Sequence, residues 1–248
     1  MSRFLFRCLA RTAIAAATYA HTACAQRTFQ VVVHPQLVAQ SADSISMAYT
    51  VVVAPPTSNA LVTFIVDAPT LLHADLPGPH SMWLVLSRYI KRPVGSFTRL
   101  DHFTAVGDST PPLALTSRGI LGIVPFWAEM NAPADTVISD SPADTSAVYD
   151  TLIVVKGMQG STVGVVNFPA YLTASGLTNR LSRLIAQACT LGWVDSQTTC
   201  SNLQAKVAAD ATSLNALLTQ LSAQRGKHVS EAAYLLISQN ASYILTRL

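Results

Sequence analysis

The stretch "SISMAYTVVV" at residues 44–53 carries the clearest secondary-structure signal in the chain. Its larger apolar side chains occupy every second position: Ile45, Met47, Tyr49, Val51 and Val53. A period of two places successive side chains on opposite faces of an extended chain, so alternation of this kind is typical of a strand with one buried face. The stretch therefore predicts a β-strand with one buried face.

Short segments of similar character extend in both directions from residues 44–53. Turn-forming stretches such as "APPTSNA" (54–60) separate them, and no helical period appears between residues 27 and 168. Pro125 predicts that its strand lies at an edge or carries a bulge. Short strands joined by Pro/Gly turns predict that residues 26–168 form an antiparallel β-sandwich, resembling immunoglobulin-like domains in a generic way. The other expected strands are "FQVVV" (29–33), "LVTFIV" (61–66), "MWLVL" (82–86), "FTRLDHF" (97–103), "LALTS" (113–117), "GIVPFWAEM" (122–130), "YDTLIVV" (149–155) and "STVGVV" (161–166).

The apolar period changes to that of an α-helix after Gly176. One helical stripe runs from Leu177 to Ala188 and a second from Leu203 to Leu221. "RGKH" (225–228) interrupts the pattern, and Ser230 is a candidate N-cap for a final helix that reaches the end of the chain. Residues 171–248 are therefore predicted to form a small bundle of three or four helices. The expected fold class is α+β, with a β-sandwich domain (26–168) followed by a helical domain (171–248).

The first 25 residues have the pattern of a secretory signal peptide. Arg3, Arg7 and Arg11 form a basic start, residues 13–20 are apolar, and Ala23-Cys24-Ala25 is a cleavage motif. The apolar stretch is too short to span a bilayer. A lipid anchor on Cys24 is a less favoured alternative. We expect an exported protein, periplasmic, surface-attached or extracellular, whose mature form has no transmembrane segment.

Composition predicts a folded chain that does not bind nucleic acid. Half of the residues are hydrophobic and 12% are charged, which is typical of a protein with a large core. The chain has 16 Lys and Arg residues against 13 Asp and Glu residues. Removal of the three arginines in the leader leaves 13 of each sign, so the mature protein is formally neutral. Nucleic-acid binding requires a concentrated positive field, which this balance does not favour.

The stretch "LIAQACTLGWVDSQTTCSN" (184–202) contains Cys189 and Cys200, eleven positions apart across an expected turn between helices. Three interpretations were considered: a zinc site, a redox pair and a disulfide. Zinc would need two more ligands, and His228 is the sole histidine of the helical part, while a redox pair usually has the C-x-x-C spacing. Because Cys8 and Cys24 would leave with the leader, a structural disulfide is the preferred prediction. Closing a loop of this size stabilises the chain by about 3 kcal/mol.

The helical part also resembles a known family. "GLTNRLSRLIAQA" (176–188) and "CSNLQAKVAADATSLNALLTQLSAQRGKHVSEAAYLLISQNASYIL" (200–245) resemble the FIMAH-type helical domains at the C-terminal ends of secreted bacterial proteins. The resemblance covers about 70 residues. It implies an accessory module of a secreted or surface-attached bacterial protein of uncharacterised function, without catalytic residues to transfer.

No motif in the sequence predicts a catalytic nucleophile, a metal or a cofactor. "QGSTVG" (159–164) resembles the G-x-S-x-G motif but has Thr162 at its centre. "HVSE" (228–231) and the aspartate-rich segment 133–150 are interpreted as a helix start and a surface loop, not as metal sites. Four scattered histidines leave a dispersed catalytic site as an alternative. They are His34, His73, His80 and His102.

One stretch of the β part interleaves cations with aromatic residues, a pattern that suits a glycan or polyanion surface. An ordinary strand followed by a basic turn gives the same pattern. We expect a non-enzymatic binding protein whose partner is an envelope protein or a glycan. A secreted hydrolase and a structural subunit of an envelope complex are the alternatives. The candidate surface consists of Trp83, Arg88, Tyr89, Lys91, Arg92, Phe97 and Arg99.

Overall fold

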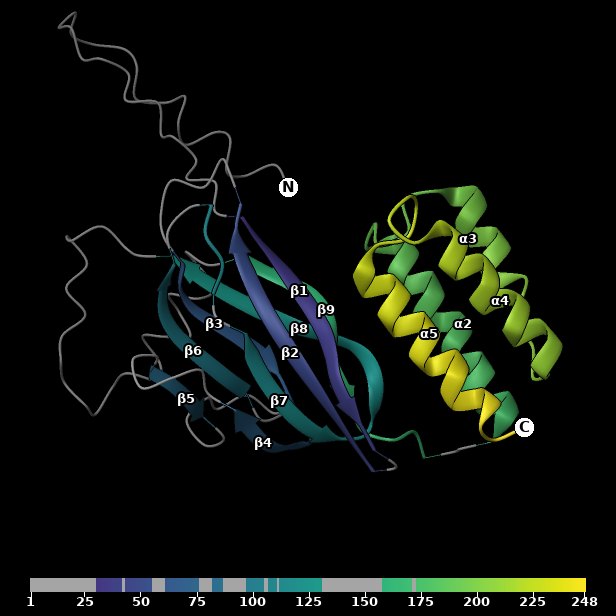
Figure 1. The fold of residues 1–248 in the computed structure, drawn as a ribbon, viewed down its shortest axis with the longest axis horizontal. Helices are drawn as coiled ribbons and strands as arrows, with labels where there is room; N and C mark the ends of the chain where they lie inside the picture. Colours follow the sequence, from purple (N-terminus) through teal and green to yellow (C-terminus); the bar gives the residue numbers. More distant parts are fainter. Residues whose placement is uncertain are drawn as a thin grey trace, which may run out of the picture.

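The computed structural model describes residues 30–41, 43–54, 61–75, 82–86, 97–104, 107–110, 112–130, 158–170 and 173–248. Within these residues the chain forms nine strands followed by four helices, with the strands at one side of the molecule and the helices at the other (Figure 1). The predicted α+β class is therefore confirmed. None of the described helices is long and apolar enough to cross a bilayer.

The strands form two antiparallel sheets. The first sheet has the order β1-β2-β7-β4, and the second has the order β5-β6-β3-β8-β9. Side chains from both sheets, including Met47 of β2 and Phe64 of β3, belong to one buried apolar cluster. The strands are β1 (Val31–Gln40), β2 (Ser44–Val53), β3 (Leu61–Asp67), β4 (Leu71–Asp75), β5 (Met82–Leu86), β6 (Phe97–Thr104), β7 (Leu113–Arg118), β8 (Ile120–Met130) and β9 (Met158–Val166).

Burial of one face of β2 explains the alternation that predicted a strand at residues 44–53. Ile45, Met47, Tyr49, Val51 and Val53 of β2 are all at most 5% exposed, while the residues between them are mostly half-buried. The strand β4 was not predicted, because "LLHAD" is short and its side chains do not alternate in polarity. The strand expected at residues 149–155 lies outside the described residues.

The edge position predicted from Pro125 is wrong for the strand as a whole. β8 lies between β3 and β9 in the second sheet. The pairing of β8 with β3 ends at Phe126, opposite Val66, so Pro125 is paired with Ser161 of β9 alone. The missing N–H of proline removes no hydrogen bond where one neighbour has already ended.

Gly119 connects the two sheets. It is the single residue between Arg118 at the end of β7 and Ile120 at the start of β8. Its φ of +145° is rare for residues with a side chain, and a Cβ built there would collide with the carbonyl oxygen of Val166. A glycine is therefore required where the chain crosses from the first sheet to the second.

Four helices form the C-terminal part: α2 (Ala174–Thr190), α3 (Gln197–Gln204), α4 (Ala211–Gln224) and α5 (Glu231–Leu245). Each begins after a residue whose side chain accepts a hydrogen bond from a main-chain N–H of the first turn, which confirms Ser230 as an N-cap. Their apolar stripes face one another in a second buried cluster. The four N-caps are Thr173, Ser196, Asp210 and Ser230.

The predicted disulfide between Cys189 and Cys200 is present. Cys189 lies near the end of α2 and Cys200 lies in α3, with their Cα atoms 6.2 Å apart. The bond therefore ties the first two helices together across the connection between them. Cys200 is buried in the cluster formed by the helices.

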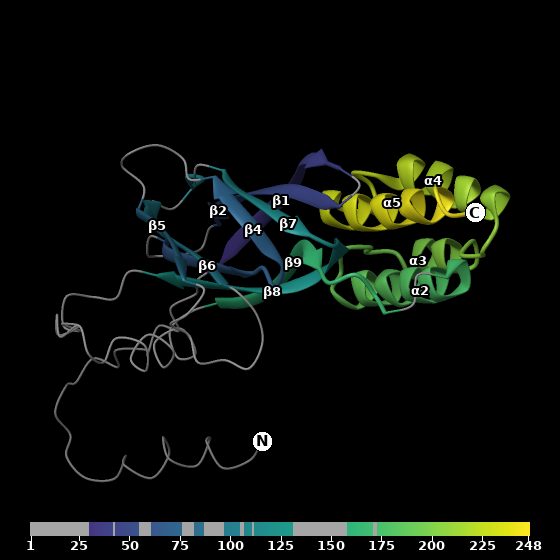
Figure 2. The ribbon, with the colours of Figure 1, turned by 90° about the horizontal axis from the view of Figure 1, so that it is seen from below.

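The helices pack against the sheets through α5, which contacts β1, β8 and β9 (Figure 2). Leu184 of α2 and Leu236 of α5 belong to the buried cluster of the sheets. In the opposite direction, Ile120 of β8 belongs to the buried cluster of the helices. The two clusters thus exchange side chains at the contact, which fixes the position of the helices relative to β8.

Candidate binding site at the junction of the sheets and the helices

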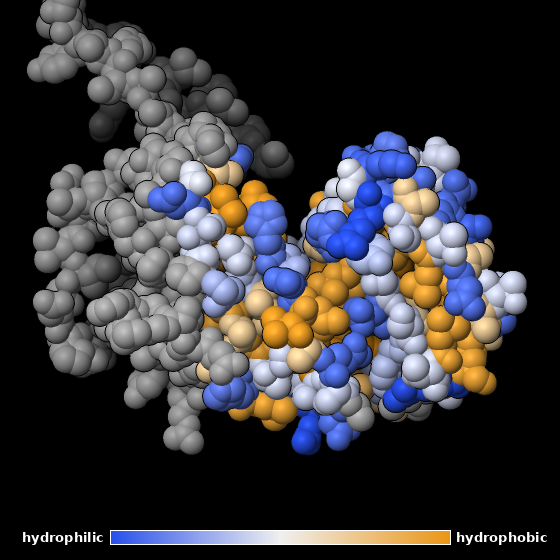
Figure 3. Space-filling model, viewed as in Figure 1, coloured by the Kyte–Doolittle hydropathy of each residue, from blue (hydrophilic) through white to orange (hydrophobic). Residues whose placement is uncertain are grey.

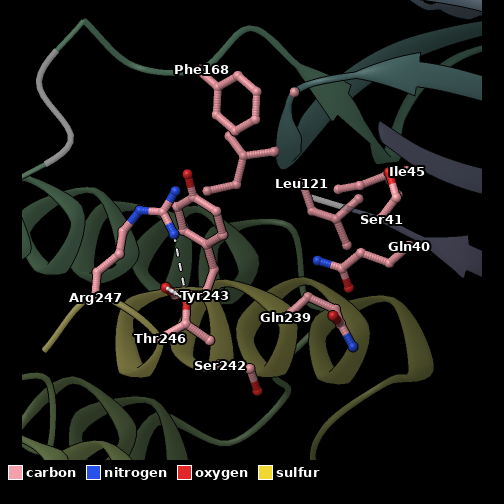
Figure 4. A pocket seen from close by; sticks show the side chains of 12 residues that line it. Gln40, Ser41, Ile45, Leu121, Phe168, Gln239, Ser242, Tyr243, Thr246 and Arg247 are labelled. Carbon is pink, nitrogen blue, oxygen red and sulfur yellow. Dashed lines mark hydrogen bonds between the residues drawn. The ribbon is translucent and has the colours of Figure 1, made fainter. Parts of the chain in front are cut away.

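A cavity of about 580 Å³ lies where the end of α5 meets the β1–β2 turn and the start of β8 (Figure 4). This size is within the range of small-molecule sites, roughly 300–1,000 Å³. Figure 3 shows apolar residues gathered on the surface where the two parts of the molecule meet. The cavity is lined by Gln40, Ser41, Ile45, Gly119, Ile120, Leu121, Phe168, Gln239, Ser242, Tyr243, Thr246 and Arg247.

The C-terminal end of the chain supplies one wall of the cavity. Gln239, Tyr243 and Arg247 follow one another at intervals of four residues, and Ser242 and Thr246 are also four apart, so these side chains share one face at the end of α5 and just beyond it. Each carries a group that can form hydrogen bonds. The helical part therefore contributes an amide, three hydroxyls and a guanidinium to this wall.

The turn between β1 and β2 supplies the opposite wall. The main-chain N–H of Ser41 donates to the carbonyl oxygen of Ser44 at 2.8 Å, and the N–H of Ser44 donates to Oγ of Ser41 at 3.0 Å. These two hydrogen bonds close the turn and hold Gln40 and Ser41 at the cavity. Figure 4 shows the Gln40 and Gln239 side chains coming from opposite walls.

A buried polar joint lies behind the cavity. The carbonyl oxygen of Leu121 accepts hydrogen bonds from Nη2 of Arg180 (2.7 Å) and from Nδ2 of Asn240 (3.1 Å), and Oδ1 of Asn240 accepts from Arg180. Asn240 also donates to the carbonyl oxygen of Leu236 at 2.7 Å. Burial, together with the neighbouring charge of Arg183, lowers the pKa of Arg180. The joint links α2, α5 and β8 at a residue that lines the cavity.

Two aromatic rings and one arginine lie together at the mouth of the cavity. The guanidinium of Arg247 lies 3.8 Å from the centre of the Tyr243 ring, and the Phe168 ring stacks near Tyr243 with centroids 6.3 Å apart. The hydroxyl oxygen of Tyr243 is buried but makes no hydrogen bond with any of the residues that the structure describes. Arg247 makes a 3.4 Å hydrogen bond to Thr246 and, within the part of the chain that is described, no ion pair.

A second hollow of about 450 Å³ adjoins the first. Phe168 lines both hollows, and Arg118, which lines the second, directly precedes Gly119 and Ile120 of the first. The Arg118 side chain is exposed and forms no ion pair with any described residue. The second hollow is lined by Thr70, Leu71, Leu72, Arg118, Asn167 and Phe168.

The described lining of both hollows is rich in groups that form hydrogen bonds. Its polar groups are amides, hydroxyls and two guanidiniums, and the described lining includes no carboxylate, imidazole or thiol. No cluster of three or more His, Cys, Asp or Glu side chains that could hold a metal occurs among the described residues.

The surface predicted from the basic and aromatic stretch stays a prediction. Residues 87–96, which include Arg88, Tyr89, Lys91 and Arg92, lie outside the described residues. The remaining three belong to described strands, but only their main-chain register is known. In that register Trp83 stands opposite Leu100, Arg99 opposite Leu84 and Phe97 opposite Leu86.

The histidines proposed for a dispersed catalytic site are separated where the structure describes them. His34 lies in β1 and His73 in β4, which are the two edge strands of the first sheet. Three strand spacings of about 4.8 Å separate these strands. His80 and the side chain of His102 lie outside the described residues, so the alternative as a whole stays a prediction.

The "HVSE" stretch has the structural role that was expected. Nδ1 of His228 lies 2.8 Å from a carboxylate oxygen of Asp195 in the α2–α3 connection. Glu231 accepts hydrogen bonds from Nε (2.9 Å) and Nη2 (2.6 Å) of Arg225. His228 is therefore partnered with Asp195, while Glu231 lies in the first turn of α5, as expected, and is partnered with Arg225.

Sequence reasoning did not find the junction cavity. Its residues come from four separate regions of the chain, between Gln40 and Arg247, and no local spacing relates them. A partial signal was present in the final helix, where Gln239, Ser242 and Thr246 place polar groups on one face. A polar helix face of this kind is also typical of an exposed surface, so it does not by itself predict a cavity.

Comparison with known proteins identified no family. No family model matches the chain, and no curated protein matches it. Among solved structures, BslA, a bacterial hydrophobin, is 12% identical; the match covers 57% of this chain and 96% of that chain, with a TM-score of 0.31. A likeness at this level does not establish a shared fold.

Proposed function

We propose that this protein is an exported, non-enzymatic binding protein that holds a glycan in the junction cavity. The observation that carries this proposal is the lining of the cavity: amide and hydroxyl groups from two walls, with Arg247 at the mouth. Side-chain amides and hydroxyls can donate and accept hydrogen bonds at once, which suits the hydroxyl groups of a sugar. No described lining residue is an acid or base suited to cleave it.

The proposal also includes a division of the chain into two domains. We take the two sheets to be the layers of an immunoglobulin-like β-sandwich and the helices to be a separate, FIMAH-like domain. The buried cluster shared by both sheets and the separate cluster within the helices support this division. The helical domain is then more than an accessory, because α5 supplies one wall of the binding site.

Export is supported by the disulfide as well as by the leader. A disulfide persists in oxidising compartments and is rare in the cytosol of most organisms. The bond between Cys189 and Cys200 is therefore consistent with a protein that functions outside the cytosol. The leader at residues 1–25 lies outside the described residues.

A glycan array carrying neutral and acidic oligosaccharides tests the binding function, using the protein from residue 26 onward. In Ser242→Trp a large ring is placed at the cavity wall, while Ser222→Trp, on an exposed position of α4, is the matched control. We expect the wild type and Ser222→Trp to bind the same glycans and Ser242→Trp to lose them. Equal binding by both variants would locate the site elsewhere, and an absence of glycan binding would refute the function.

A further inference from the structure

We propose that the ligand is an elongated acidic glycan, whose successive carboxylates are bound by Arg247 in the first hollow and Arg118 in the second. This inference rests on the proposed glycan-binding function and names the chemical class of the glycan. It is carried by two guanidiniums that form no ion pair with any described residue and lie in adjoining hollows that share Phe168.

Arg247 is held in position without a counter-ion among the described residues. Its guanidinium lies over the Tyr243 ring at 3.8 Å, which orders the side chain while leaving most of its N–H donors unused. A guanidinium presents its donors as a planar fork that matches the two oxygens of a carboxylate. A ligand carboxylate would therefore supply the partner that the described residues do not.

Arg118 supplies a second guanidinium, so the ligand that we infer carries more than one carboxylate. It lies at the end of β7, one residue before Gly119, so the chain leads directly from the second hollow to the first. A small anion could contact one guanidinium at a time. A chain with a carboxylate on each sugar can contact both, passing Phe168 between them.

The surrounding charge favours an acidic ligand. No described residue that lines either hollow is acidic. Asp43, in the β1–β2 turn, is the acidic residue nearest in sequence to Ser41, and it lines neither hollow. Residues 171–248 carry six Lys and Arg residues against three Asp and Glu residues. A local excess of positive charge attracts anions and makes their binding sensitive to salt.

The Tyr243 hydroxyl lies close to the same hollow. In Figure 4 the Tyr243 ring lies between Arg247 and Phe168, with its hydroxyl on the side of Phe168. The hydroxyl oxygen is buried and makes no hydrogen bond with any described residue. Because it has almost no accessible surface, a ligand oxygen would reach it only after a neighbouring side chain moves, so the inference does not depend on this contact.

Isothermal titration calorimetry with an oligogalacturonate of about five sugars tests the inference. The comparison ligand is the same oligosaccharide with its carboxylates fully methyl-esterified, which removes the charge and keeps the chain. We expect the acidic form to bind at least tenfold more tightly, and high salt to remove the difference. Galacturonate monomer and inorganic phosphate should bind much more weakly than the oligomer.

Three arginine variants locate the contacts. Arg118→Gln and Arg247→Gln should each weaken oligogalacturonate binding about tenfold or more, and Arg247→Lys should recover part of the loss. Lys227→Gln, at an exposed position between α4 and α5 outside both hollows, also removes one positive charge; it is the matched control and should bind like the wild type. Far-ultraviolet circular dichroism of each variant shows whether the fold is kept.

These experiments distinguish an error in the inferred acidic ligand from an error in the proposed glycan-binding function. Equal binding of the charged and esterified oligomers, abolished by Ser242→Trp, would overturn the acidic ligand and leave the glycan-binding function intact. Monomer or phosphate binding as tight as that of the oligomer would overturn the span across both hollows. An unchanged affinity of Arg118→Gln for the oligomer would also overturn the span across both hollows.

Discussion

Asn240 on α5 and Leu121 on β8, 119 residues apart in the chain, are joined by a hydrogen bond from Nδ2 to the main-chain oxygen, with the two atoms 3.1 Å apart. The same oxygen accepts a second hydrogen bond from Arg180 of α2. Asn240 is 2% exposed, so this contact forms away from water. Because Leu121 also lines the junction cavity, the hydrogen bonds that dock the helices also hold one side of the candidate site.

Asn240→Leu tests the contribution of this joint to stability. The variant keeps a side chain of similar size but leaves the Arg180 guanidinium and the Leu236 carbonyl oxygen short of a partner. We expect the free energy of unfolding in urea to fall by about 1–3 kcal/mol, the usual cost of an unsatisfied buried group. Asn215→Leu, at an exposed position of α4, is the control and should change it by less than about 0.5 kcal/mol. Equal effects of the two substitutions would contradict a structural role for the joint.

The disulfide predicts a loss of stability on reduction. Reduction, or Cys200→Ser, should lower the free energy of unfolding of the helical part by about 2–4 kcal/mol, because the unfolded chain is no longer constrained. Urea unfolding followed by circular dichroism at 222 nm, with and without reductant, measures the change. The reductant should have no further effect on Cys200→Ser. Two free thiols in the unreduced, unfolded protein would show that the bond does not form.

Gly119→Ala compared with Gly107→Ala separates backbone strain from steric collision. Both glycines have positive φ, +145° and +89°, but a Cβ on Gly107 meets no atom within 4 Å. The alanine at 107 should therefore cost about 1–2 kcal/mol for its backbone conformation alone. The alanine at 119 also collides with the Val166 carbonyl oxygen, which should add about 1–3 kcal/mol. Similar melting temperatures for the two variants would argue against a tight crossing at Gly119.

Two exposed carboxylates at helix starts predict a fall in stability at acid pH. Hydrogen bonds from Ser213 lower the pKa of Asp210, and hydrogen bonds from Arg225 lower the pKa of Glu231, relative to their ordinary values of 3.8 and 4.5. A lowered folded-state pKa gives a contribution that is fully present above the unfolded-state pKa and is lost as the pH falls through the folded-state pKa. The loss should therefore begin below about pH 5 and continue below pH 4.

Asp210→Asn combined with Glu231→Gln tests this pH dependence. Asparagine is as good an N-cap as aspartate, and neither replacement titrates. Melting temperatures measured between pH 7 and pH 2.5 should fall less steeply for the double variant than for the wild type. Asp67 acts in the opposite direction, because burial raises its pKa, and it is unchanged in both proteins. Parallel curves would show that these two carboxylates do not contribute.

Local sequence patterns were sufficient for much of the fold. The alternation in residues 44–53 predicted β2, because one face of that strand is buried and the other is not. Ser230 and the stripe after it predicted the start of α5, because an N-cap and a helical period act within a few residues. The pairing of Cys189 with Cys200 was predicted from their spacing and from the expected removal of the other cysteines with a leader, and the bond is present. These features depend on interactions between near neighbours in the chain.

The candidate site was decided by tertiary structure alone. Pro125 indicated an edge strand, but whether β3 continues past Val66 to pair with it depends on where two distant strands stop. In the same way, Arg118, Phe168 and Arg247 are ordinary surface residues in the sequence, and only the docking of α5 against β8 brings them together. The hydrogen bonds that fix this docking join atoms separated by 119 and 59 residues. A local pattern carries no information about contacts at such a separation, because their geometry is set by the packing of the whole chain.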